Sequence, residues 1–299
     1  MRFPAFVIAL VWVTAAGAGT APAAGFDTAT LPAAFGPPAA DTAAIAVNVR
    51  QRLPSSMSVV HGYGLVVATS DSMEEAAKEA ERIARLDATL RRRAFPNLEH
   101  RPIIVVVAGD GAALRGLAES LYPALSGGVL PTGGFYHPID RLIVTETVAG
   151  DATLLRELTR AHLRDDNPDA PHWFEQALVT LYESVEPRDD RLVPILNRRM
   201  NQISPDQDLS YAVFAGICDC SPISEEQIAL MRLLFIFLEG RDQLPQLLAT
   251  IAALGQYTTL LQALDGMNFD GATWKAFAER SVGDYASCRK CTTFRKVIT

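Results

Sequence analysis

Residues 156–183 read RELTRAHLRDDNPDAPHWFEQALVTLYE, and the first five of them have the spacing of a known metal-binding motif. In His-Glu-x-x-His, two histidines one helical turn apart bind zinc, and the glutamate between them is the general base. Here Glu157 is present, but Arg156 and Arg160 occupy the histidine positions. A guanidinium stays protonated and has no lone pair to give a metal. The helix therefore has the spacing of a zinc site without its ligands.

The second half of this stretch runs Pro-x-Trp-x-x-Gln-Ala-Leu, from Pro171 to Leu178. With the first motif followed by this second one, the chain resembles the gluzincin-type zinc metallopeptidases of the peptidase MA group. Small exported bacterial members of that family open this second helix with Pro-x-Trp-x-x-Glu-Gly-Leu-Ala, and its glutamate is the third zinc ligand. The resemblance places Gln176 at that third position. It implies a family member in which all three ligand positions are replaced, Glu157 is a vestigial general base, and zinc is lost.

The resemblance covers roughly residues 60–185. Family members carry two strand–helix units and a Gly-x-Tyr hairpin before the zinc helix, and the matching segments here are residues 65–90, 101–121 and 133–146. The resemblance further implies a cleft between an α/β part and a helical part. The residues that it assigns to this cleft are Tyr136, Trp173, Glu175 and Glu183.

The N-terminus has the composition of an export signal. A short basic start, Met1-Arg2, precedes an apolar run to Ala16 and then a small-residue stretch that suits cleavage. The run is too short to span a membrane, and no later run reaches about 20 apolar residues. We therefore expect a signal peptide at residues 1–24 and a periplasmic or secreted protein. Residues 25–45, rich in Ala, Pro and Thr, are expected to be a disordered lead-in.

The charge balance bears on the kind of partner. The net charge is −7 and the chain has no basic tract, which argues against nucleic-acid binding. The sequence contains no Gly-x-Ser-x-Gly elbow and no phosphate-binding loop that could replace the lost metal chemistry. We therefore expect a protein or peptide partner.

Four cysteines form two close pairs, Cys218 with Cys220 and Cys288 with Cys291. An exported chain meets oxidising conditions, so disulfides are expected. A bridge within Cys-x-Cys is strained, which favours two cross-bridges between the 218–220 loop and the C-terminal tail. Each would close a loop of roughly 70 residues and stabilise the protein by about 4 kcal/mol in the chain-entropy model. A zinc site of all four cysteines is the alternative.

Hydrophobic periodicity predicts an α+β fold. Residues 46–185 are expected to form an α/β part with a small mixed sheet, packed on a mainly helical part at residues 186–299. Strands are expected at 65–69 and 103–107, with a hairpin across 135–145. Helices are expected at 73–93, 111–121, 153–163, 171–183, 225–238, 244–254, 257–264 and 273–281.

The arginines at positions 156 and 160 admit several interpretations. They are either solvated on an exposed helix or joined in an ion-pair network with Glu157, Glu175 or Glu183 that fills the former zinc pocket. A pocket for an anionic ligand such as a peptide carboxylate is a further alternative.

A replacement metal site would draw on histidines near the expected cleft, which are His137, His162 and His172. His162 lies well off the helix face of the two arginines, and His172 is expected to be exposed, so such a site is disfavoured.

The sequence is compatible with two functions. The first is a non-catalytic pseudopeptidase that acts as a binding or scaffold module. The alternative is an active metallopeptidase or hydrolase with non-standard ligands.

Overall fold

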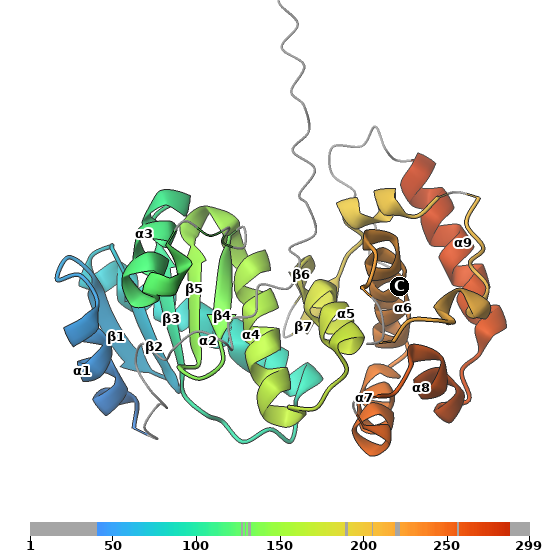
Figure 1. Cartoon of the computed structure of the whole chain (residues 1–299), viewed down its shortest axis with the longest axis horizontal. Coiled ribbons are helices and arrows are strands. Elements are labelled where there is room, and N and C mark those ends of the chain that lie inside the picture. The colour runs from blue at the N-terminus through green and yellow to red at the C-terminus, as the bar shows by residue number, and fades with distance from the viewer. Residues whose placement is uncertain are drawn as a thin grey trace, which may run out of the picture.

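The computed structural model describes residues 41–287, except residues 127, 129, 131, 132, 189, 190, 205, 219–221 and 256. The predicted signal peptide and most of the predicted lead-in lie outside the described residues. The fold is α+β, as the sequence predicts, with a mixed sheet in the N-terminal part and mainly helices in the C-terminal part (Figure 1). Among the described helices, none combines the length and apolarity that a membrane crossing requires.

Five strands form the sheet of the N-terminal part, in the order β1-β2-β3-β5-β4. The three inner strands are parallel, and both edge strands are antiparallel to their neighbours. The inner strands are buried on both faces, which explains their continuous apolar sequences. The strands are β1 (Ser58–Gly62), β2 (Leu65–Thr69), β3 (Ile103–Ala108), β4 (Gly134–His137) and β5 (Leu142–Glu146).

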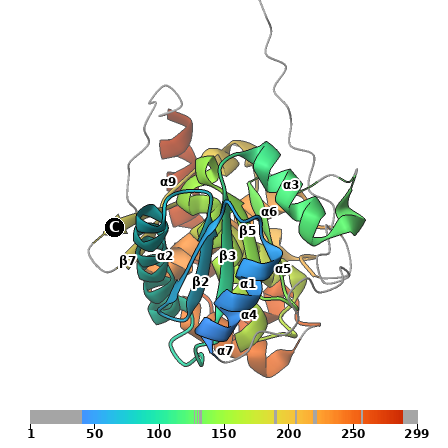
Figure 2. The ribbon, with the colours of Figure 1, turned by 90° about the vertical axis from the view of Figure 1, so that its left-hand side faces the viewer.

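Helices cover both faces of this sheet. Because side chains alternate along a strand, Leu65 and Val67 enter one core and Val66 enters the other. The first core also contains residues of α2 (Met73–Ala94) and α4 (Gly150–Asp166). The second contains residues of α1 (Thr42–Arg52) and α3 (Gly111–Leu121). Figure 2 shows α2 and α3 on opposite sides of the strands.

The helix α5 (His172–Tyr182) leads into the C-terminal part and packs against both α4 and α6. Buried side chains of α5 and the later helices belong to the same core cluster as α2 and α4. The two parts therefore share one continuous core, with α4 and α5 at their junction (Figure 1). The further helices are α6 (Glu225–Gly240), α7 (Leu244–Leu254), α8 (Leu260–Gly266) and α9 (Gly271–Ser287).

Arg232 interrupts the apolar sequence of α6, yet its side chain is buried. Its Nε donates to the Thr180 carbonyl at 2.7 Å, and Nη2 donates to the Ile195 carbonyl at 2.7 Å and the Ser184 carbonyl at 3.2 Å. Burial lowers the pKa of Arg232 to about 10. The buried guanidinium thus supplies donors to carbonyl groups at and beyond the end of α5.

Two expected boundaries need correction. The lead-in expected at 25–45 ends earlier, because the Asp41 side chain caps α1 and the helix begins at Thr42. Ile45, Ala46 and Val49 hold this helix on the sheet. The part from residue 186 onward is also not purely helical. It opens with an antiparallel hairpin of β6 (Val185–Arg188) and β7 (Arg191–Pro194).

Candidate functional site

The motif helix α4 carries a buried carboxylate between two arginines. Glu157 is 1 % exposed, and each of its oxygens accepts a hydrogen bond from a different guanidinium. Arg156 Nε donates to Oε1 at 2.7 Å, and Arg160 Nη1 donates to Oε2. Arg156 also reaches the carbonyl of Gly134 on β4 at 3.3 Å. The two arginines that flank Glu157 at the spacing of the sequence motif therefore both engage its carboxylate.

Glu175, in the first turn of α5, extends this cluster across the α4–α5 contact. Its Oε1 accepts a hydrogen bond from Arg160 Nε at 2.8 Å, and its Oε2 lies 2.8 Å from Nη2 of Arg164. The result is a chain of alternating charges in the order Arg156, Glu157, Arg160, Glu175, Arg164, which we call the charge cluster. The network expected from the sequence is present for Glu157 and Glu175.

The electrostatics of the charge cluster follow from burial and pairing. Burial alone would raise the pKa of Glu157, but the charges of Arg160 and Arg156 and their hydrogen bonds outweigh it, so the pKa is lowered. Burial would lower the pKa of Arg160, but Glu157 and Glu175 outweigh it, and the pKa is raised. Glu157 is thus an ionised, weakly basic carboxylate.

The residues at the motif positions do not fit a zinc ion. Zinc takes neutral imidazole, thiolate or carboxylate donors, and a guanidinium offers none of these. Both oxygens of Glu157 are already engaged by cations. Within the described part of the chain, no group of three or more His, Cys, Asp and Glu side chains has the arrangement of a metal site.

Other residues assigned to the site are not members of the charge cluster. The half-buried Gln176 has its amide nitrogen 3.5 Å from His172 Nε2, and Glu175 rather than Gln176 is the α5 side chain bonded to Arg160. Glu183 follows α5 and pairs with Arg199 at 2.9 Å. The cleft positions assigned to two aromatic residues are core positions, since Tyr136 and Trp173 are buried. Burial raises the pKa of Tyr136 to about 12.

The three histidines considered for a replacement metal site do not share one location. His162 is buried, with Nε2 2.5 Å from Oδ1 of Asp87 on α2. Asp87 also pairs with Arg91 at 3.1 Å, and His162 and Arg91 lower its pKa against the effect of burial. His172 is exposed at the start of α5. His137 is buried at the end of β4, 3.0 Å from Asp140.

Of the four cysteines, the structure describes Cys218, which is disulfide-bonded. Cys220, Cys288 and Cys291 lie outside the described residues. The predicted cross-bridges between the two cysteine pairs therefore remain a prediction.

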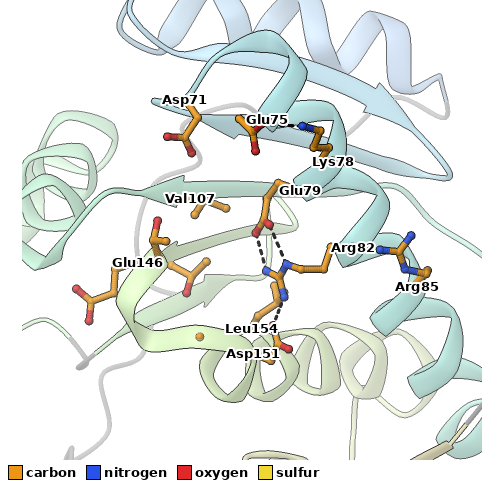
Figure 3. A pocket seen from close by; sticks show the side chains of 13 residues that line it. Asp71, Glu75, Lys78, Glu79, Arg82, Arg85, Val107, Glu146, Asp151 and Leu154 are labelled. Atoms are coloured by element: carbon orange, nitrogen blue, oxygen red, sulfur yellow. Dashed lines mark hydrogen bonds and ion pairs between the residues drawn. The ribbon is translucent and has the colours of Figure 1, made fainter. Parts of the chain in front are cut away.

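A cavity that the sequence did not indicate lies between α2 and the start of α4, at the carboxyl ends of β2, β3 and β5 (Figure 3). Its volume is about 590 Å³, and this edge of a parallel sheet is a common place for ligands. Its basic residues are already paired: Arg82 with Glu79 and Asp151, Lys78 with Glu75, and Arg85 with Glu81. We assign no ligand to this cavity. The lining residues are Asp71, Glu75, Lys78, Glu79, Arg82, Arg85, Val107, Thr145, Glu146, Thr147, Gly150, Asp151 and Leu154.

The chain matches no model of a known protein family and no curated protein.

Proposed function

We propose that this protein is an exported, non-catalytic relative of the gluzincin peptidases that acts as a binding or scaffold module. The observation that carries the proposal is the state of Glu157. Its two carboxylate oxygens are held by Arg156 and Arg160, the residues at the two histidine positions of the zinc motif. An ion-pair cluster thus takes the place of the metal-binding group.

The chemistry of the motif explains why this arrangement argues against hydrolysis by the zinc mechanism. In a zinc peptidase the metal lowers the pKa of a bound water toward about 7, and the motif glutamate accepts its proton. A carboxylate whose pKa is lowered by two guanidiniums is a weaker proton acceptor. The site therefore lacks the ligands that would hold a metal, and Glu157 lacks the basicity that the reaction requires.

Purified mature protein provides the test. Zinc content measured by mass spectrometry should be far below one ion per chain, and casein should not be cleaved above the level of a buffer control. The competing proposal, an active hydrolase with non-standard ligands, requires zinc near one ion per chain. It also requires that His162→Ala or His172→Ala removes both zinc and activity, and that pair of results would replace our proposal.

A further inference from the structure

Three arginines of α4 follow one another at intervals of four residues and form a row along one face of the helix. We call Arg156, Arg160 and Arg164 the α4 arginine row. Their side chains are 22 %, 23 % and 49 % exposed, so each of the three has atoms at the surface. The sequence motif singled out the first two, and the third joins them through Glu175.

The two carboxylates that pair with this row hold the guanidiniums in place but do not engage all of their N–H donors. Glu157 and Glu175 are 1 % and 7 % exposed at the side chain. Among the described residues, Nη1 of Arg156 and Nη2 of Arg160 have no hydrogen-bond partner, and Arg164 pairs with Glu175 through Nη2 at 2.8 Å. Oriented donors with unused capacity favour binding, because little side-chain entropy is lost when they engage a ligand.

We propose that the α4 arginine row binds the carboxylates of an acidic peptide segment on a partner protein. The inference rests on the proposed function as a binding module and names its partner class. Three guanidiniums face two carboxylates in the charge cluster, an excess of positive charge in a chain whose net charge is −7. A guanidinium offers a planar fork of donors that matches a carboxylate.

The spacing of the row selects the form of the peptide. Residues four apart on a helix are separated by about 6 Å along its axis. Alternate residues of an extended peptide are separated by about 6.6 Å and point to the same side. Acidic residues at every second position of an extended segment would therefore meet successive arginines, whereas consecutive acidic residues would point to opposite sides.

Fluorescence anisotropy on the mature chain tests this inference. The probe is a labelled peptide with glutamate alternating with serine, compared with a peptide of the same composition whose glutamates are consecutive. The alternating peptide should bind more tightly, and added salt should weaken its binding. Arg164→Gln should weaken binding about fivefold, a magnitude typical of one partly exposed charge pair.

Arg85→Gln is the matched control, because Arg85 is an exposed helical arginine paired four residues away with Glu81. It removes the same charge elsewhere and should change the affinity less than about twofold. Equal effects of the two variants, equal binding of the two peptides, or no binding would overturn the inference. Displacement of the peptide by inorganic phosphate at the peptide's own concentration would also overturn it in favour of a free-anion site.

Zinc measured on the same preparation separates the two proposals. Absent zinc with no peptide binding leaves the pseudopeptidase proposal standing and removes the acidic partner. Bound zinc near one ion per chain removes the pseudopeptidase proposal whatever the peptide does.

Discussion

Replacing Glu157 by glutamine removes the central carboxylate of the charge cluster while keeping its size. The substitution loses hydrogen bonds from Arg156 and Arg160 and turns an amide N–H₂ toward a guanidinium. Breaking a fully buried ion pair costs about 3–5 kcal/mol. Here both arginines remain partly exposed and Arg160 keeps its bond to Glu175, so we expect a loss of about 2 kcal/mol in the free energy of unfolding.

The effect should depend on pH in a defined direction. The folded state lowers the pKa of Glu157, so the stability that this carboxylate supplies is fully present above its unfolded pKa of about 4.3. That stability is lost as pH falls through the lower, folded pKa. The difference between wild type and Glu157→Gln should therefore be constant near neutral pH and shrink below about pH 4.

Urea unfolding at several pH values measures this difference. Glu81→Gln is the control, since Glu81 forms an exposed ion pair with Arg85 and should cost less than about 0.5 kcal/mol. If Glu157→Gln and Glu81→Gln are equally mild at neutral pH, the charge cluster does not stabilise the α4–α5 junction as argued.

Four further predictions concern the fold. Gly134→Ala should destabilise the protein by about 3 kcal/mol or more, because its φ is +146° and a Cβ would lie 2.3 Å from the Val144 carbonyl oxygen. Gly116→Ala, exposed within α3 with open space around it, should instead stabilise it by up to about 1 kcal/mol in the same denaturation assay. Arg232→Met should cost about 3 kcal/mol by leaving buried carbonyls without donors, and an unchanged denaturation midpoint would refute that role. Intact mass after alkylation without reductant should show all four cysteines oxidised, whereas four alkylated thiols would defeat the predicted cross-bridges.

Local sequence patterns located most of the fold. The apolar runs at β2 and β3 are bounded by Pro, Gly or capping residues, and α3 and α7 begin and end where their periodicity does. The helix α1 was missed because its sequence, TAAIAVNVRQR, continues an Ala-rich stretch and is held by packing on the sheet. The β6–β7 hairpin was missed because proline and charged residues interrupt its alternation. Its flanking Ser184 and Ile195 carbonyls are bonded by the distant Arg232.

The site was predicted in part. Motif spacing indicated that Glu157 and Glu175 would meet the arginines, and both do. Glu183 instead meets Arg199, a contact that depends on how the chain after α5 folds back and that no local spacing reveals. Arg164 continues the four-residue spacing from Arg160, a signal that was visible in the sequence but lay outside the motif.

The measurement that tests the central claim most directly is zinc stoichiometry in a variant that restores the motif. Arg156→His, Arg160→His and Gln176→Glu together supply two imidazoles and a carboxylate at the three ligand positions. The matched control, Arg156→Gln, Arg160→Gln and Gln176→Glu, loses the same arginines without gaining imidazoles. We expect zinc near one ion per chain in the restored variant and little in the control or the wild type. A folded restored variant that binds no zinc would contradict the proposed relation to the zinc motif. Stoichiometric zinc in the wild type would contradict the pseudopeptidase function itself.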